Sequence, residues 1–190
     1  RAILGIGAGH VEGEFAALGL AFSQRGVATD AAIATIRRAF AHEELQLAGE
    51  TVALAPRPVQ RGGVPIWVGG SSRAAIRRAA RFGDGWLPQG TPRDELPAQT
   101  ACLREERKRA QGDAPIAIGA NAEPLYVGRP AWDVGPRALH GPAGHLAERL
   151  GAFAAMGVSQ VQLRFRARSE AELLDQMDAF HAEVAPQLPA

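Results

Sequence analysis

Short apolar runs alternate along this chain with longer amphipathic runs, and glycine or proline separates most of them. The clearest short runs cover residues 2–7, 65–68 and 85–88, and further ones lie at 115–127 and 158–165. Runs of this length with few polar residues are typical of strands in a parallel sheet covered on both faces. The alternation therefore predicts repeated strand–helix units and an α/β fold.

The amphipathic runs carry signals for where helices begin and end. We expect helices to begin near Asp30, at Ser71 or Ser72, at Thr91 and at Ser169, because each of these side chains can accept a hydrogen bond from the first turn. Another helix should end at Gly157. Each helix follows a strand, as crossover connections between parallel strands require.

Two of these helices permit finer expectations. In the helix after Ser72 the 3.6-residue spacing places four arginines in water, and Gly83 should end the helix in the left-handed conformation. In the last helix the same spacing predicts an apolar buried face. The arginines are Arg73, Arg77, Arg78 and Arg81, and the buried residues are Leu173, Met177, Phe180 and Val184.

Five strand–helix units at this spacing fit two architectures. One is an open, doubly wound sheet, and the other is most of a (β/α)8 barrel. The periodicity does not separate them. A non-helical insertion is expected over residues 49–63, which hold several prolines and glycines.

Composition narrows the class of protein. The 190 residues are 46% hydrophobic and carry a formal net charge of +1, which excludes a disordered chain and does not suggest a nucleic-acid partner. The single cysteine, Cys102, allows no intrachain disulfide, so a cytoplasmic location is expected. No run approaches the roughly 20 apolar residues that cross a bilayer, so we expect no membrane partner.

One stretch combines several anion-binding features. Gly69 and Gly70 end a predicted strand, and Ser71 and Ser72 open a predicted helix. Free backbone N–H groups, serine hydroxyls and the positive end of the helix dipole would meet there, which suits a phosphate. The alternative is an ordinary strand-to-helix turn with a serine cap, and local sequence leaves both open.

Other candidate chemistry is sparse. His10 follows the first strand and would lie on the functional rim of a barrel. The Gly5–Gly9 stretch lacks the third glycine of a dinucleotide fingerprint. No histidine or cysteine spacing indicates a metal site, and no nucleophile motif is present.

Taken in order, several segments resemble the luciferase-like flavin-dependent oxidoreductases. They are LGIGAGH with Glu14-Phe15, Leu18-Gly19 and Arg25-Gly26, followed by PRPVQ, PIWVGGSSRAAIRRAARFGDGW, LYVGRPAWDVG and GVSQVQLRF. The resemblance implies a TIM barrel of which residues 1–190 form a single luciferase-like domain covering about strands 4 to 8. It further implies that the N-terminal strand–helix units are absent. A partial barrel has unpaired edges, so we expect this chain to aggregate or to form a homo-oligomer.

The resemblance also implies the cofactor and its contacts. FMN or the deazaflavin coenzyme F420 would place its phosphate against the turn, with the ring near the end of the first strand. The implied contacts are Gly9, His10, Gly69, Gly70, Ser71, Ser72, Gln89 and Gly90. By its position, His10 is the candidate beside the ring. Family members often have tryptophan, and some an acidic residue, where His10 stands, so this chain departs from the family at the ring contact and no catalytic residue is assigned.

The implied activity is oxidation or reduction of a small organic substrate, either with reduced FMN and oxygen or by hydride transfer from the deazaflavin. A flavin reductase would then be a partner. Two alternatives remain at this point. One is a non-catalytic flavin-binding or assembly module, and the other is an unrelated phosphate-binding barrel enzyme such as an aldolase. The aldolase would need a lysine on a strand, and Lys108, the only lysine, lies in a predicted helix.

Overall fold

The structure is a computed structural model that describes residues 2–60 and 62–189. It divides into two compact units. The first contains the residues up to Thr91 together with Ala101–Ile116, and the second contains Pro92–Thr100 and the residues from Ala117 onward. Helix α4 (Leu96–Gln111) contributes to both.

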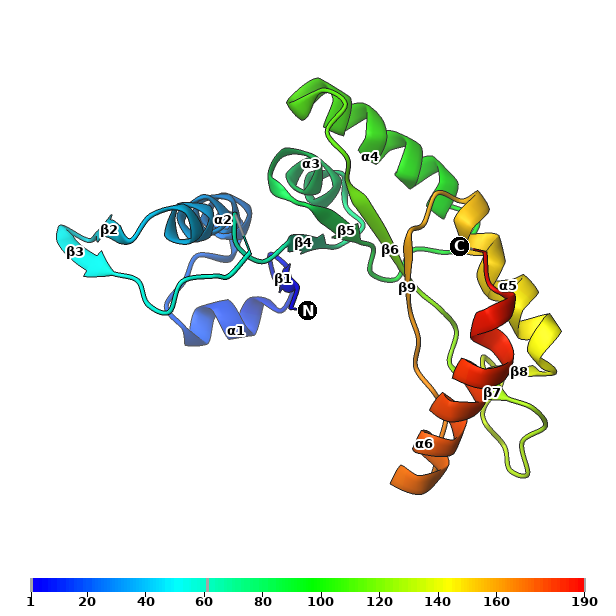
Figure 1. The fold of residues 1–190 in the computed structure, drawn as a ribbon. Helices are drawn as coiled ribbons and strands as arrows, with labels where there is room; N and C mark the ends of the chain where they lie inside the picture. The colour runs from blue at the N-terminus through cyan, green and yellow to red at the C-terminus, as the bar shows by residue number, and fades with distance from the viewer. Residues whose placement is uncertain (1, 61, 190) are drawn as a thin grey trace. The chain divides into compact units, whose positions relative to one another are not determined.

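The first unit contains parallel strands joined by helices, together with a β-hairpin (Figure 1). Its elements are β1 (Leu4–Ile6), α1 (Glu12–Ala17), the 3₁₀ turn η1 (Phe22–Gln24), α2 (Arg25–Ala41), β2 (Glu44–Leu47), β3 (Glu50–Ala53), β4 (Ile66–Gly69), α3 (Arg73–Phe82) and β5 (Gly85–Leu87). Strand β4 pairs in parallel with β1 on one side and β5 on the other. Helix α3 packs on β4 and β5, and α2 packs on α3.

The core of the first unit forms where these layers meet. Ile66 and Val68 of β4 and Trp86 of β5 are buried, and so is Ile33 of α2. Helix α3 turns small residues, including Ala79, toward the strands. These predicted strands are confirmed, because their apolar residues are covered on both faces.

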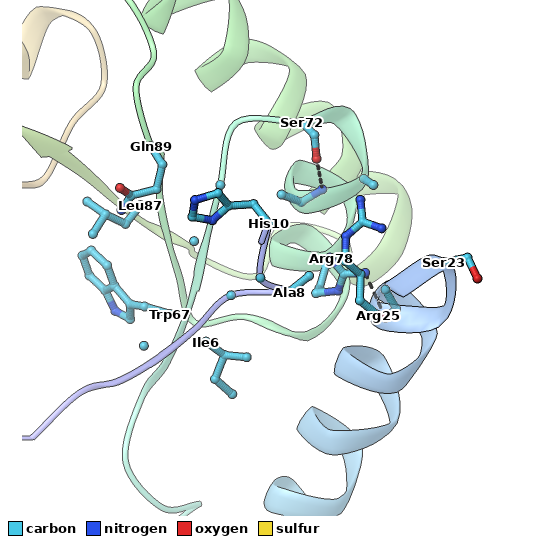
Figure 2. A pocket seen from close by; sticks show the side chains of 18 residues that line it. Ile6, Ala8, His10, Ser23, Arg25, Trp67, Ser72, Arg78, Leu87 and Gln89 are labelled. Atoms are coloured by element: carbon cyan, nitrogen blue, oxygen red, sulfur yellow. Dashed lines mark hydrogen bonds between the residues drawn. The ribbon is translucent and has the colours of Figure 1, made fainter. Parts of the chain in front are cut away.

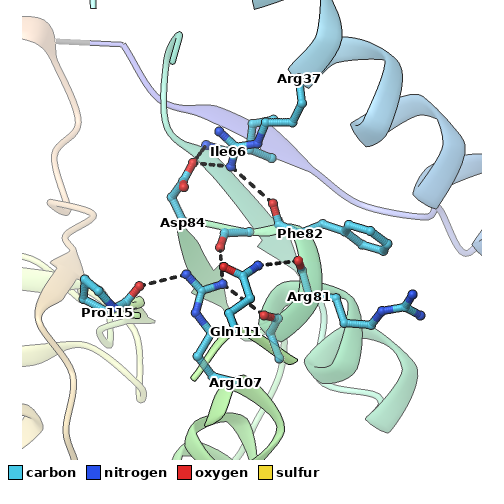
Figure 3. Close-up of polar contacts among 10 residues, drawn as sticks. Arg37, Ile66, Arg81, Phe82, Asp84, Arg107, Gln111 and Pro115 are labelled. Carbon is cyan, nitrogen blue, oxygen red and sulfur yellow. Dashed lines mark hydrogen bonds and ion pairs between the residues drawn. The ribbon is translucent and has the colours of Figure 1, made fainter. Parts of the chain in front are cut away.

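A buried arginine joins the helices and loops of this unit. Arg107 on α4 donates to the carbonyl oxygens of Ala80, Gly83 and Pro115 at 2.9–3.0 Å and of Ala114 at 3.2 Å (Figure 3). Burial lowers the pKa of its guanidinium, whereas nearby Asp84 acts in the opposite direction. The guanidinium therefore satisfies several carbonyl groups at the ends of α3 and α4 that have no partner within a helix.

Two expectations about α3 are wrong. Arg78 is only 8% exposed, because it faces α2, where a carboxylate and a carbonyl accept its hydrogen bonds. Gly83 has a φ of −88° rather than a left-handed one. A glycine is needed at position 83 for steric reasons, since a Cβ there would lie 2.9 Å from the carbonyl oxygen of Ala79.

Helix boundaries also differ from the expected ones. Helix α2 begins at Arg25, before Asp30, because η1 leads directly into it and the Thr29 hydroxyl bonds back to the Arg25 carbonyl. Helix α4 begins at Leu96 rather than Thr91. An antiparallel hairpin of β2 and β3 begins before the insertion expected over residues 49–63 and continues into it, and its tight turn has positive φ at Ala48 and Gly49.

The second unit contains two pairs of parallel strands and a helical C-terminal region. Its elements are β6 (Ala117–Asn121), β7 (Leu125–Val127), β8 (Leu139–Gly141), α5 (Ala143–Ala155), β9 (Gln160–Gln162), α6 (Glu170–Ala179), the π-helical turn η2 (Phe180–Val184) and the 3₁₀ turn η3 (Ala185–Gln187). Strand β6 pairs with β9, and β7 pairs with β8.

The buried face expected for the last helix is only partly correct. Val184 is buried as expected, but Leu173 and Met177 are 37% and 47% exposed, and Gln176 is buried in their place. The Gln176 side chain accepts from the Val127 N–H at 2.5 Å and donates to the Val127 carbonyl at 3.3 Å. A polar side chain therefore occupies the inward position because it completes the hydrogen bonding of β7.

Candidate functional site

The turn between β4 and α3 presents unpaired backbone donors. Ser72 caps α3, and its Oγ accepts from the Ala75 N–H at 3.2 Å. The N–H groups of residues 71–74 have no hydrogen-bond acceptor among the described residues. This is the arrangement that binds anions at helix N-termini.

Glycine is required at the bend of this turn. Gly70 has a φ of +112°, and a Cβ on it would lie 3.1 Å from the Cβ of Ala75. Its carbonyl oxygen accepts from the Trp86 indole N–H at 2.8 Å, and its N–H donates to the Leu87 carbonyl at 3.1 Å. The Gly70 backbone is therefore fixed by β5, which leaves the next four N–H groups for a ligand.

Ser71 connects this turn to the loop after β5. Its hydroxyl donates to the Gln89 carbonyl at 2.9 Å and accepts from the Gln89 N–H at 2.9 Å and the Thr91 hydroxyl at 2.6 Å. The hydroxyl has no capacity left for a phosphate. Ser71 can contribute its backbone N–H, whereas the Ser72 hydroxyl still has its proton available.

A cavity of about 1130 Å³ opens beside the turn, within the first unit. It is lined by the end of β1 and the residues after it, by the turn itself, and by residues of α2, α3 and β5. In Figure 2, Trp67 and Leu87 lie on one side, Arg25 and Arg78 on the other, and His10 between them. The cavity is therefore apolar at one wall and cationic at the other.

Most of the residues expected to bind cofactor come together here. Those that line the cavity are Gly9, His10, Gly69, Gly70, Ser72 and Gln89. Ser71 and Gly90 are not among the lining residues, although the Ser71 hydroxyl holds the loop that contains both Gln89 and Gly90. The structure thus joins two segments that are far apart in sequence, residues 9–10 and 69–72.

Sequence reasoning missed the cationic wall. Arg25 donates to the Phe22 carbonyl at 2.8 Å and lies 3.8 Å above the Phe22 ring, while Arg78 bonds to Asp30 and to the Gly26 carbonyl. No aspartate or glutamate is among the lining residues. The Arg25-Gly26 pair was part of the family resemblance, but nothing in the helical pattern indicated that Arg78 faces inward.

The described residues contain no cluster of three or more histidine, cysteine or acidic side chains placed to hold a metal. Nor does any of the described helices have both the length and the apolar composition needed to cross a membrane. The cavity is accordingly characterised by its backbone donors, its two arginines and His10.

Comparison with known proteins identifies the relatives of this chain. The family model described as luciferase-like monooxygenase matches residues 1–134. An uncharacterised protein of Mycobacterium tuberculosis is 32% identical over 123 residues. That alignment covers 62% of this chain and 42% of the relative, so the chain spans less than half of the curated relative it matches.

Solved structures share the fold at low identity. A monooxygenase from Streptomyces bottropensis aligns with a TM-score of 0.76 and 17% identity, over 96% of this chain and 67% of that one. An F420-dependent secondary alcohol dehydrogenase, solved with an F420–acetone adduct, aligns with a TM-score of 0.76 and 14% identity, over 98% and 69%. The α/β fold expected for part of a TIM barrel is thereby confirmed. Because the family model matches residues 1–134, which are more than half of this chain, the chain belongs to the luciferase-like monooxygenase family.

Proposed function

We propose that this chain forms the cofactor-binding part of an oxidoreductase that uses FMN or the deazaflavin coenzyme F420. The observation that carries the proposal is one cavity lined both by the end of β1 and by Ser72 and Ala74, whose N–H groups at the start of α3 are free. An anionic phosphate suits the first feature, and a flat ring suits the second. The alcohol dehydrogenase of similar fold was solved with an F420 adduct, which supports the same cofactor class.

The residues present fit a phosphate-bearing cofactor. The N–H groups at the start of α3 lack acceptors, and the cavity lining carries arginine but no carboxylate. The Ser72 hydroxyl can donate, and the Trp86 indole holds the Gly70 carbonyl by a hydrogen bond. A dianionic phosphate would therefore meet hydrogen-bond donors, and the Gly70 carbonyl oxygen of the turn already accepts a hydrogen bond from Trp86.

The other end of the cavity suits the ring. Gly5, Gly7 and Gly9 lie along the strand end, where the missing side chains allow a planar group to approach the backbone. Trp67 and Leu87 supply an apolar wall, and His10 supplies a hydrogen-bonding edge. When bound, the cofactor would supply the hydride or oxygen chemistry, while the protein orients it and excludes water.

The finer features of the activity belong to this proposal. The substrate is a small organic molecule, a flavin reductase supplies reduced cofactor in the FMN case, and the two units belong to one luciferase-like domain. The active protein is a homo-oligomer. His10 is the candidate group beside the ring, and no catalytic residue is assigned.

Titration of the purified protein with FMN and with F420 tests the proposal. We expect one of them to bind with a shift of its absorption spectrum. A Ser72→Asp variant, which keeps a capping acceptor at the start of α3 but adds a carboxylate to the cavity lining, should bind about tenfold or more weakly because the carboxylate would adjoin the phosphate. If neither cofactor binds, or if Ser72→Asp has unchanged affinity, the site assignment is wrong. Binding without turnover by reduced nicotinamide or reduced deazaflavin would favour the non-catalytic module.

A further inference from the structure

Arg78 departs from the pattern of its own helix. The other arginines of α3, at positions 73, 77 and 81, are exposed, whereas Arg78 is 8% exposed and lines the cavity. Burial of a guanidinium is unfavourable unless its charge and its N–H groups find partners. The buried position of Arg78 therefore depends on specific partners, unlike the positions of the three exposed arginines.

Those contacts all lie on the first turns of α2. The Arg78 Nε bonds to the carboxylate of Asp30, and its Nη2 donates to the Gly26 carbonyl at 3.0 Å. A Cβ on Gly26 would lie 3.0 Å from that same Nη2 atom. Position 26 thus carries a glycine where the guanidinium approaches the α2 backbone most closely.

This contact attaches Arg78 to the turn of α2 that also contains Arg25. Arg25 is the residue before Gly26, and its side chain is held by the carbonyl and the ring of Phe22. Arg25 lines the same cavity as Ser72 at the start of α3. With α2 bound to α3 through Arg78, Arg25 lines one cavity together with Ser72 and Ala74, whose N–H groups are free.

The titratable side chains that line the cavity are all basic. Arg25, Arg78 and His10 are the titratable groups that line the cavity, and Asp30, which pairs with Arg78, is outside the lining. The second amino group of Arg78, Nη1, has no hydrogen-bond partner among the described residues. A phosphate in this cavity would meet cationic groups that no lining carboxylate neutralises.

We infer that Arg78 is a positioning residue for the cofactor's phosphate group, acting through Gly26 and Arg25 of α2. It selects phosphorylated cofactors over the same ring without phosphate. The inference rests on the proposed function, because it takes the phosphate of that cofactor as its ligand. It assigns a role to Arg78, which lies outside the β4–α3 turn, and it states that the site distinguishes ligands by their phosphate group.

Binding of FMN and of riboflavin, which lacks the phosphate, tests the inference in the purified protein. The variants are Arg78→Gln and Gly26→Ala, which disturb the same contact from opposite sides. Arg77→Gln is the matched control, since it removes the same charge from the exposed face of α3. Quenching of flavin fluorescence gives both dissociation constants, and thermal melting shows whether each variant is folded.

We expect Arg78→Gln and Gly26→Ala to weaken FMN binding by about tenfold or more, with a flatter dependence on salt, and to leave riboflavin binding within about twofold. Arg77→Gln should bind both as the wild type does. Unchanged FMN affinity in both variants, or an equal loss for FMN and riboflavin, overturns the inference and assigns Arg78 a purely structural role.

A separate measurement distinguishes failure of the proposed function from failure of the inference about Arg78. If the wild type binds neither FMN nor F420, that function fails, and stabilisation against melting by inorganic phosphate becomes the readout. Stabilisation of the wild type and of Arg77→Gln, but not of Arg78→Gln, then supports the role of Arg78 at an anion site. Equal stabilisation of all three, or of none, overturns it.

Discussion

Three arginines of the first unit have different roles because they lie in different environments. Arg109 is in solvent, Arg78 faces the cavity, and Arg107 is buried among carbonyl groups. The environment determines which role each has, because a guanidinium can satisfy several acceptors at once only where the chain brings them together.

Replacing Arg107 by methionine should destabilise the protein strongly. The change keeps much of the side-chain volume but leaves the carbonyl groups of Ala80, Gly83, Ala114 and Pro115 without their donor. Removing one partner of buried polar groups costs about 1–3 kcal/mol or more, so we expect a loss of about 3 kcal/mol in the free energy of unfolding. Urea denaturation measures it. Arg109→Met, at an exposed position, should change stability by less than about 0.5 kcal/mol, and similar effects of the two changes would contradict the role of Arg107.

Gly70→Ala should weaken both the fold and the site. Alanine is strained at a φ of +112°, and its Cβ would crowd Ala75 at the start of α3. We expect a loss of about 1–3 kcal/mol in stability and weaker FMN or F420 binding. Calorimetry and cofactor titration check the two effects. Gly13→Ala is the control, because Gly13 lies in α1 with an ordinary φ and open space, and it should leave cofactor binding unchanged.

At the scale of elements, α6 is anchored by polar contacts rather than by an apolar face. Glu172 accepts from the Trp132 indole at 2.7 Å, the Tyr126 hydroxyl at 3.3 Å and the Arg168 N–H at 2.8 Å. The Arg168 N–H first, and then the Trp132 indole, lower the pKa of Glu172 to about 2. Burial first, and then Glu172, raise the pKa of Tyr126. One carboxylate thus connects α6 to β7 and to the loop that contains Trp132.

The low pKa of Glu172 predicts a pH dependence of stability. A carboxyl whose pKa is lower in the folded state stabilises the fold above its unfolded value of 4.5, and that contribution is lost as the pH falls from there to about 2. We expect Glu172→Gln to melt at a lower temperature at neutral pH and to lose less stability than the wild type between pH 4.5 and 2.

Melting curves across that pH range provide the measurement. Glu170→Gln removes the same charge from the same helix turn without these partners and serves as control. A wild type and a Glu172→Gln variant with parallel pH profiles would show that the contacts of Glu172 do not stabilise the ionised carboxylate.

At the scale of the whole molecule, apolar surface and an open strand edge coincide near the N-terminus. Among the described residues β1 pairs only with β4. Ile3, Leu18, Leu20 and Val27 are exposed by 48–74%. Apolar surface and unpaired strand edges both favour association between chains.

We therefore expect the 190-residue chain to self-associate. Sedimentation should show a concentration-dependent rise in mass, and Leu18→Lys combined with Val27→Lys should reduce it. Val59→Lys, also at an exposed position, should have no such effect. A monodisperse monomer that unfolds cooperatively would contradict this expectation.

The sequence by itself determined the main strand–helix units and the position of the β4–α3 turn. It did not predict α1, the β2–β3 hairpin or β8, and it left the cap of α3 open between Ser71 and Ser72. Apolar runs for β1, β4 and β5 and the cap at Ser169 are local signals, because periodicity and capping depend on residues a few positions apart. The ordered motifs also identified the family. The cofactor and its contact residues, however, were predicted from the family resemblance rather than from the spacing of residues.

Only the tertiary structure decided which distant residues meet. The burial of Arg78 depends on Asp30 and Gly26 of another helix, and that of Gln176 depends on the backbone of β7. The Ser71 hydroxyl is occupied because folding brings Gln89 beside it. A helical pattern assigns a polar residue to water unless a partner is known, and such partners are established by packing between elements.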